Sequence, residues 1–432
     1  MRNTIRLTII LLLITILHSY GQSFSPVRLD SLFKALERSH QAMGSVCISK
    51  DGKVIYSRAF GMYEPGKIAN TLTQYRIGSI TKTFTAVMVL QLAKEHKLAL
   101  NTSISKYFPQ VAGSGKITID QLLGHTSGLH DFTRDADYNA YSQQPTTKAQ
   151  MLARIARYRP DFAAGQKTVY SSTNYLLLGY IIEHVTGKNY AANLQQRITA
   201  KLGLQHTTYQ YGLKPNQASS YNFNGSAWVP VPPTQLSVPG GAGGMLSTPT
   251  DLVQFIRSLF KFKLLTADAV TSMTPATGNL GRGLIQVPVA DQMGYGHFGI
   301  IDGFKSSLIY LPQSDLALAV CLNSANADDN AVVEQTLNIT LQQLSNNIKL
   351  PTAQLSKYVG TYVSRQATLP ITLRAAGGYL LMQAGDRQIL NLETLSPTRF
   401  RLAKGAMIID FGSNPAHFTL KQVDKVYEYY KQ

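Results

Sequence analysis

The sequence has little cysteine. Of its 432 residues only two are cysteines, Cys47 and Cys321, which excludes a small fold built on disulfide bonds. Both lie in apolar runs typical of strands, where a buried free thiol is the expected state. If those strands are neighbours in one sheet, a single disulfide is the alternative. The chain is 44% hydrophobic and 15% charged, which excludes intrinsic disorder.

Acidic residues are also scarce. There are 24 of them against 41 lysines and arginines, so the formal net charge is +17 and the pI is about 9.7. Such a balance can indicate a nucleic-acid partner. The basic residues are scattered, however, and form no basic helix or nucleic-acid module. We therefore expect no nucleic-acid partner, but a basic surface that tolerates or attracts anionic polymers of the cell envelope.

Long apolar runs are missing outside the N-terminus. There, Arg2 and Arg6 precede an apolar stretch over residues 7–17, and Ser19-Tyr20-Gly21 has the small-x-small pattern of a cleavage site. The sequence predicts a signal peptide over residues 1–21 and an exported protein, periplasmic or secreted. The stretch is shorter than the ~20 residues that span a bilayer, so we expect no stable membrane span after cleavage. An uncleaved anchor is the alternative.

Metal and cofactor signatures are absent as well. The chain has no HExxH or CxxC pattern, and its nine histidines are dispersed. The glycine-rich segment GGAGGM at 240–245 lacks the GK[ST] ending of a phosphate-binding loop. We expect no metal and no cofactor, and we interpret this segment as a close-packed wall of a cleft.

Two domains are predicted from the patterns that are present. Residues 22–347 combine strands at both ends with helices between them, which indicates an α+β domain. We expect an antiparallel sheet, flanked by helices and accompanied by an all-helical subdomain, in which an early hairpin turning at Asp51-Gly52 joins a late meander. The expected elements are a helix over 28–40, helices with long loops over 100–260, strands over 294–303, 304–312 and 316–325, and a helix over 329–344.

Residues 348–432 alternate apolar and polar residues between short turns. This pattern predicts a small all-β domain, a meander or barrel. It contains no titratable constellation that indicates chemistry. Its expected role is to pack against the main domain or to cover its cleft.

A lysine stands out near the start of a helix that is otherwise almost free of charge. Lys82 lies three residues after Ser79 in IGSITKTFTAVMVLQLAK, so the two side chains share one helix face. Burial makes part of such a lysine neutral near pH 7, and a neutral amine can take the proton of a serine hydroxyl. The SxxK pattern alone is not specific, since it also occurs at Ser31, Ser103 and Ser258, in segments that fit surface helices or loops.

Two later segments add candidate residues. Tyr170 comes directly before another apolar helix, and His297 lies on an expected strand where Gly299 allows a ligand close to the backbone. Taken singly, the tyrosine fits a packed aromatic and the histidine a hydrogen-bonded sheet residue. Together with Ser79 and Lys82, and in this order along the chain, they form one set of candidate catalytic residues.

SITK at 79–82, YSS at 170–172 and HFG at 297–299, supported by HTSGL at 125–129, resemble the motifs of the serine β-lactamase and penicillin-binding protein superfamily. Residues 25–347 look most like the branch related to class C β-lactamases, DD-peptidases and esterases. The C-terminal region is similar to a lipocalin-like β-domain that is often appended to such hydrolases.

The resemblance implies a role for each residue. Ser79 would be acylated, and Lys82 and Tyr170 would share its proton, with the Lys82 cation lowering the pKa of Tyr170. His297 would line the site and hydrogen-bond towards Ser79 or Tyr170. The backbone N–H groups of Ser79 and Ile300 would form the oxyanion hole. The strand that carries Gly299 and Ile300 could also pair with an extended substrate.

Two departures from the family pattern bear on the substrate. Ser172 stands where asparagine is usual, and His297 takes the place of a lysine, so contacts to β-lactams and to substrate carboxylates are weaker. The resemblance therefore implies a serine hydrolase that acts through an acyl-enzyme on an ester, amide or D-amino peptide, rather than an efficient β-lactamase. The substrate would be a small molecule or derived from peptidoglycan; the oligomeric state stays open.

Two other functions remain as alternatives. One is a non-turnover protein of the same fold that binds penicillin or senses peptidoglycan or lipid. The other is a glycosidase that uses Asp131, Asp135 and Asp137, because paired carboxylates can act as acid and base. We expect those aspartates to belong to a solvated polar loop.

Overall fold

The computed structural model describes residues 24–210, 215–290, 292–346, 349–402, 407–422 and 425–432. The chain divides into two compact units, one comprising residues 26–337 and the other built on residues 338–432. The signal peptide expected over residues 1–21 lies outside the described residues. No helix in the described part of the chain is both long enough and apolar enough to cross a bilayer.

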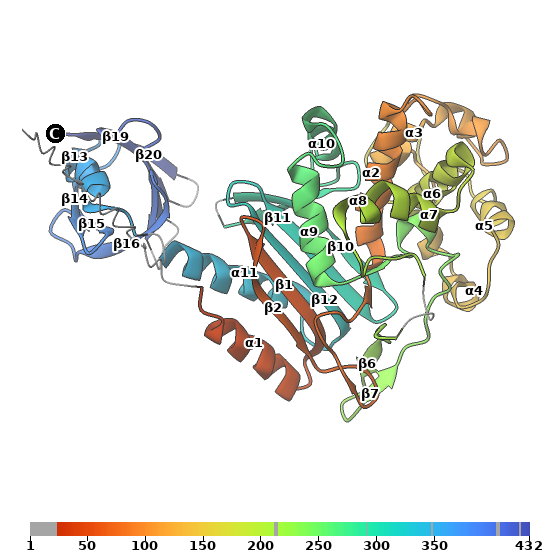
Figure 1. Ribbon diagram of the computed structural model, residues 1–432. Helices are drawn as coiled ribbons and strands as arrows, with labels where there is room; N and C mark the ends of the chain where they lie inside the picture. The colour runs from red at the N-terminus through yellow and green to blue at the C-terminus, as the bar shows by residue number, and fades with distance from the viewer. Residues whose placement is uncertain (1–23, 211–214, 291, 347–348, 403–406, 423–424) are drawn as a thin grey trace, which may run out of the picture. The chain divides into compact units, whose positions relative to one another are not determined.

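A six-stranded antiparallel sheet forms the centre of the first unit, in the order β2-β1-β12-β11-β10-β9 (Figure 1). β1 pairs with both β2 and β12, which confirms that the early hairpin joins the late meander. Asp51 and Gly52 turn the hairpin with positive φ values, as a two-residue turn requires. The strands are β1 (Ala42–Lys50), β2 (Lys53–Phe60), β9 (Ile285–Val289), β10 (Gln292–Ile301), β11 (Phe304–Leu311) and β12 (Leu316–Ala325).

Helices and three small sheets complete this unit. The helix α9 packs on β1, β11 and β12 (Figure 1). Thr248 caps it and Pro249 occupies its first turn, where the missing N–H of proline is no loss. The helices are α1 (Val27–Arg38), α2 (Thr81–Lys94), α3 (Ile119–Leu123), α4 (Tyr138–Ser142), α5 (Lys148–Ile155), α6 (Ser172–Thr186), α7 (Tyr190–Leu194), α8 (Ala200–Leu202), α9 (Pro249–Phe260) and α10 (Ala267–Met273). The next helix, α11 (Asp329–Asn346), contains the boundary between the two units. The small sheets pair β3 (Met62–Glu64) with β4 (Lys67–Ile68), β5 (Tyr75–Arg76) with β8 (Leu246–Ser247), and β6 (Tyr221–Phe223) with β7 (Trp228–Pro230).

The helices α2, α3, α6 and α7 lie together beyond one end of the sheet (Figure 1). Every residue of α2 from Thr81 to Leu92 is buried, so this helix runs through the core. The Phe84 ring stacks on Phe255 of α9, with ring centroids 3.6 Å apart. Such aromatic packing ties the start of α2 to a helix that lies on the sheet.

The two cysteines lie on neighbouring strands and are nevertheless free. Cys47 on β1 faces Ala319, whereas Cys321 on β12 faces Ser45, so the two thiols are staggered by two residues. Burial raises the pKa of Cys47 to about 11 and that of Cys321 to about 12, so both are unreactive thiols at neutral pH. The single disulfide left open by the sequence is not formed.

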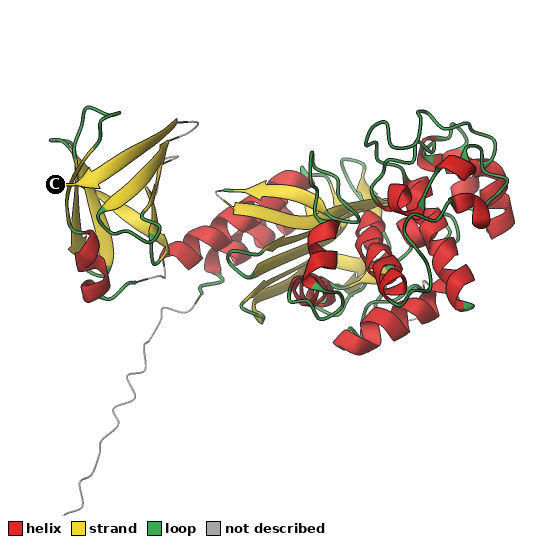
Figure 2. Ribbon diagram, turned by 90° about the horizontal axis from the view of Figure 1, so that it is seen from above, coloured by secondary structure: helices red, strands yellow, loops and turns green. Residues whose placement is uncertain are grey.

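The second unit contains a closed eight-stranded antiparallel barrel, so the expected all-β fold is confirmed (Figure 2). Pairing of β13 with β20 closes it. Its core is filled by aromatic side chains, including Tyr362, Phe411 and Phe418. The elements are α12 (Thr352–Leu355), β13 (Gly360–Val363), β14 (Ile371–Ala376), β15 (Tyr379–Ala384), β16 (Leu390–Ser396), β17 (Arg399–Leu402), β18 (Met407–Asp410), β19 (His417–Gln422) and β20 (Lys425–Lys431).

Removal of the Phe84 ring tests the core around α2. We expect Phe84→Ala to lower the free energy of unfolding by about 3–5 kcal/mol, because it leaves a cavity against Phe255. Denaturant unfolding followed by the fluorescence of Trp228, the only tryptophan of the chain, measures this unit. Phe262→Ala is the control, since Phe262 is 54% exposed and should change stability by less than ~1 kcal/mol. Equal losses in both variants would contradict the expected packing.

Candidate active site

Ser79 and Lys82 are in direct contact at the start of α2. Ser79 lies in a short 3-10 turn, Gly78–Ile80, that leads into the α-helix at Thr81, so the helix begins two residues later than the serine. Lys82 Nζ lies 2.9 Å from Ser79 Oγ. The i, i+3 spacing therefore places the amine at the hydroxyl, as the sequence predicts.

The Lys82 amine is buried among polar atoms of two other segments. Its side chain is 1% exposed, and Nζ donates to the Ala242 carbonyl at 2.8 Å and to Ser172 Oγ at 3.5 Å. Burial lowers the pKa of Lys82 to about 7, while the negative charge of Asp131 partly opposes this shift. The neutral amine is consequently accessible near pH 7.

Tyr170 lies directly before α6, and Lys82 Nζ is 4.8 Å from the centroid of its ring. Burial raises the pKa of Tyr170, and its hydrogen bond with Ser79 only partly offsets this effect. The expectation that a Lys82 cation lowers this pKa is therefore wrong, because loss of water disfavours the phenolate more than its surroundings stabilise it. The phenol stays protonated at neutral pH.

His125, from the HTSGL segment, supports Tyr170. Its ring stacks on the Tyr170 ring with centroids 4.6 Å apart. Its Nδ1 accepts the backbone N–H of Ser171 at 3.2 Å, so this nitrogen carries no proton. Burial and the nearby Lys82 charge hold the pKa of His125 well below its usual value. A neutral histidine thus fixes the segment that carries Tyr170.

His297 lies on β10 beside Tyr170, with ring centroids 6.2 Å apart. Its Nδ1–H donates to the carbonyl of Phe298 at 2.6 Å, so the expected hydrogen bond towards Ser79 or Tyr170 is replaced by one to its own strand. A carbonyl can only accept, and Nε2 is therefore the unprotonated nitrogen. Burial, followed by the Lys82 charge, lowers the pKa of His297 to about 4.

The end of β10 lies against the turn that carries Ser79. β9 pairs with β10 only through Gly296, and within the described residues no strand covers this edge of β10 from His297 onward. A Cβ on Gly299 would be 2.0 Å from the Ile77 carbonyl oxygen and 3.1 Å from Ser79 N. A Cβ on Gly78, whose φ is +49°, would be 2.9 Å from Ile300 N. Both glycines are needed for the backbone N–H groups of Ser79 and Ile300 to lie near one another.

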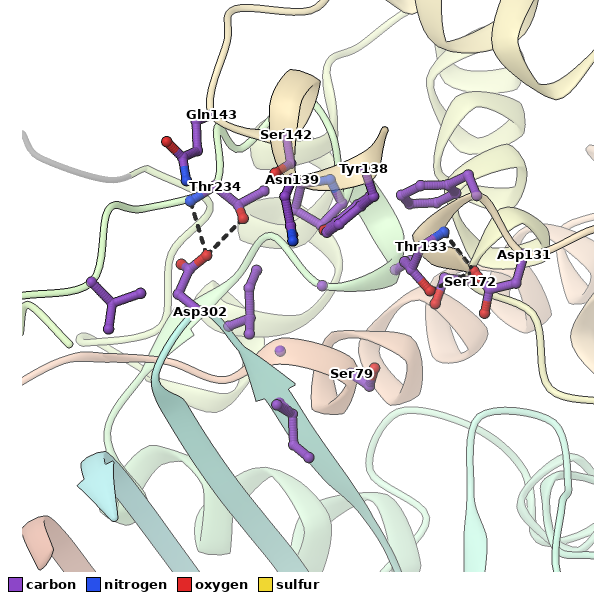
Figure 3. A pocket seen from close by; sticks show the side chains of 18 of the residues that line it. Ser79, Asp131, Thr133, Tyr138, Asn139, Ser142, Gln143, Ser172, Thr234 and Asp302 are labelled. Atoms are coloured by element: carbon purple, nitrogen blue, oxygen red, sulfur yellow. Dashed lines mark hydrogen bonds between the residues drawn. The ribbon is translucent and has the colours of Figure 1, made fainter. Parts of the chain in front are cut away.

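A cavity of about 580 Å³ opens over Ser79 (Figure 3). Of the predicted site residues, Ser79, Tyr170, Ser172 and Ile300 line this cavity, whereas Lys82, His297 and Gly299 do not. Ala242 and Gly243 form part of its wall, as expected for the glycine-rich segment.

The three aspartates of the glycosidase alternative do not form a catalytic pair. Asp135 binds His130 and Asp137 binds Arg154, while only Asp131 lines the cavity. Asp131 and Asp135 are 8% and 7% exposed, so the expectation of a solvated loop is wrong for two of the three. Asp131 is thus a candidate site residue that the sequence analysis missed, because it assigned this aspartate to a solvated loop. Its position directly after HTSGLH was the available signal.

A metal centre has no support in this site. No group of three or more histidine, cysteine or acidic side chains that could hold a metal ion occurs among the residues that the structure describes.

The fold and the contacts among Ser79, Lys82 and Tyr170 define a serine hydrolase. The chain belongs to the beta-lactamase family, whose sequence model matches residues 29–341. It is 30% identical to the teichoic acid D-alanine hydrolase of Staphylococcus aureus over 283 residues, which cover 62% of this chain and 70% of that protein.

Solved structures of similar fold include two enzymes named for D-amino acid substrates. A D-stereospecific amidohydrolase from Streptomyces sp. has a TM-score of 0.62 and 29% identity, covering 71% of this chain and 97% of its own. A D-amino acid amidase from Ochrobactrum anthropi SV3, complexed with L-phenylalanine amide, has a TM-score of 0.62 and 25% identity, covering 74% and 99%. The recognition of fold and enzyme class from the sequence is confirmed.

A methyl group on Gly299 tests the close approach of β10 to Ser79. We expect Gly299→Ala to reduce hydrolysis of p-nitrophenyl acetate about 100-fold, because the added Cβ forces β10 and the serine turn apart. Initial rates on purified protein measure the effect, and circular dichroism checks the fold. Gly115→Ala is the control, since its added Cβ meets no atom within 4 Å. Wild-type activity in Gly299→Ala would show that this contact does not position the serine.

Proposed function

We propose that this hydrolase releases D-aminoacyl groups, such as D-alanyl, from esters or amides through an acyl-enzyme on Ser79. The single observation that carries the proposal is the 2.9 Å contact between Ser79 Oγ and a lysine amine whose pKa is about 7. The choice of D-aminoacyl substrates is supported by the names of the similar proteins, which act on teichoic acid D-alanine or on D-amino acid amides.

Lys82 acts as the base in this proposal. A neutral amine has two N–H groups and one lone pair. When the N–H groups donate to the Ala242 carbonyl and Ser172 Oγ, the lone pair is left to accept the proton of Ser79 Oγ, which lies 2.9 Å away. As Ser79 Oγ bonds to the substrate carbonyl carbon, its proton moves to Lys82 Nζ. The backbone N–H groups of Ser79 and Ile300 stabilise the negative charge on the carbonyl oxygen.

Tyr170 acts as the proton carrier to the leaving group. Its phenol is protonated at neutral pH and hydrogen-bonded to Ser79. It donates to the departing oxygen or nitrogen and is reprotonated from Lys82; in the second half, water releases the acyl group along the reverse path. Ser172 supplies one hydrogen bond at the substrate, and neutral His297 borders the tyrosine on the side of β10.

The proposed cellular context follows from the N-terminus and the charge. We propose a signal peptide over residues 1–21, a hydrolase domain over 22–347 and a β-barrel domain over 348–432, with the mature enzyme periplasmic or secreted. Its substrate is a small molecule or a fragment of the cell envelope such as peptidoglycan, and not nucleic acid.

Removal of the serine hydroxyl tests the nucleophile. We expect Ser79→Ala to reduce ester turnover at least 1,000-fold, because it removes the proposed nucleophile, the hydroxyl 2.9 Å from the Lys82 amine. Ser31→Ala removes an exposed serine of another SxxK match and should leave turnover unchanged. The measurement is release of p-nitrophenol over many enzyme equivalents. A single burst without turnover would instead support the sensor alternative.

The pH dependence tests the base. The pKa of Lys82 is lowered to about 7 in the folded protein, so the neutral amine is lost as the pH falls through 7. We expect kcat/KM for p-nitrophenyl acetate to rise up to pH 7, to fall about tenfold per pH unit below it, and to be nearly constant from pH 8 to 9.

Rates between pH 5 and 9, corrected with Ser79→Ala, provide this profile. Lys82→Arg serves as the control, because a guanidinium stays charged over the whole range and should be inactive throughout. A flat wild-type profile, or one that still rises about tenfold per pH unit up to pH 9, contradicts the role of Lys82 as a neutral base.

A further inference from the structure

The cavity over Ser79 is acidic, in contrast to the chain as a whole. Two charged residues line it, Asp131 and Asp302, and no lysine or arginine does so among the described residues (Figure 3). The chain carries a formal net charge of +17. The cavity is therefore a local exception in the charge distribution.

Asp302 is neutralised within the protein. Its Oδ2 accepts from Arg76 Nη1 at 2.5 Å, and this ion pair is buried on both sides. Its Oδ1 accepts from the backbone N–H and the hydroxyl of Thr234, at 3.0 and 2.6 Å. Both oxygens are thus engaged, and Asp302 fixes the loop around Thr234 to the end of β10.

Asp131 is only half engaged. Its Oδ1 accepts from the backbone N–H and the hydroxyl of Thr133, at 3.1 and 2.9 Å (Figure 3). Its Oδ2 has no hydrogen bond or ion pair within the described part of the chain, although the residue is 8% exposed and lines the cavity. The Lys82 amine, whose pKa the Asp131 charge raises, makes no ion pair with it in the described residues, so the cost of losing water around this largely buried carboxylate is incompletely compensated. A ligand that brings a cation into this cavity removes that cost.

We propose that Asp131 binds the ammonium group of an aminoacyl substrate and makes the enzyme select acyl groups that carry a free amine. The inference rests on the proposed function, because the acyl group must be the one transferred to Ser79. The same charge repels substrates with a carboxylate beside the scissile bond. An uncharged analogue of the same size cannot form this buried charge pair, so the enzyme discriminates against it.

An indirect effect through Lys82 is the competing explanation. The Asp131 charge raises the pKa of Lys82, so its removal also alters the base. A change in the base affects every ester that Ser79 attacks. A lost ammonium contact affects only the substrate with the amine, and the ratio between two matched substrates separates these effects.

The substrates for the test are D-alanine methyl ester and D-lactic acid methyl ester, which differ in an ammonium and a hydroxyl group. For wild-type enzyme at pH 7 we expect kcat/KM to favour the alanyl ester at least 10-fold. In Asp131→Asn, whose amide oxygen can still accept from Thr133, we expect this preference to fall by about 10- to 100-fold. Methanol release measures both reactions.

Asp135→Asn is the matched control. Asp135 lies in the same loop and is equally buried, but it binds His130 and does not line the cavity, so the preference should stay at the wild-type value. Thermal unfolding verifies that both variants are folded. If Asp131→Asn does not fold, the preference of the wild-type enzyme between the two esters still tests the inference, because it is measured without a variant.

Two results overturn the inference: no preference in the wild type, or an unchanged preference in Asp131→Asn, which includes equal losses on both esters. Hydrolysis of both esters that depends on Ser79 supports the proposed function in each of these cases. Hydrolysis that persists in Ser79→Ala contradicts the proposed function itself, and so separates the two failures.

Discussion

The contact of a desolvated lysine amine with a serine hydroxyl is the constraint on which the rest of the site depends. Lys82 sits in a helix that is buried through a dozen consecutive residues, where an ammonium without partners is strongly disfavoured. The amine is tolerated because Ala242 and Ser172 accept its N–H groups. The glycine-rich loop and the start of α6 must therefore both approach α2, and Gly179 of α6 lies against Gly241 to allow it.

Much of this architecture could be predicted because its signals are local. An Asp-Gly turn between two alternating segments specifies the first hairpin, and three strands separated by tight turns specify the meander. The apolar α2 and α6 are equally visible, as is the change to alternating patterns in the C-terminal region. The SxxK spacing needs only helix geometry, which explains why Ser79 and Lys82 were found together.

What could not be predicted depends on neighbours that are distant in the chain. The direction of the Tyr170 pKa follows from how completely α6, β10 and the HTSGL segment exclude water, and no sequence pattern encodes that exclusion. The partner of His297 is the carbonyl of the next residue, a choice set by the path of β10 along the serine turn. Asp131 was assigned to a solvated loop because its burial arises from elements more than 40 residues away.

The net charge of the protein acts on a substrate at long range, whereas the carboxylate of Asp131 acts at contact, and the two favour different features of a substrate. A net charge of +17, spread over the surface, attracts anions over a Debye length of about 8 Å at physiological salt. A single, largely buried carboxylate in the cavity acts only at contact, but with less screening. The two preferences do not oppose each other, since an anionic envelope polymer that bears aminoacyl groups presents negative charge at long range and an ammonium at the reacting bond. A neutral ester is attracted neither by the net positive charge nor by the carboxylate in the cavity. A substrate with a carboxylate at the scissile bond is attracted at long range by the net positive charge but is repelled by the carboxylate in the cavity.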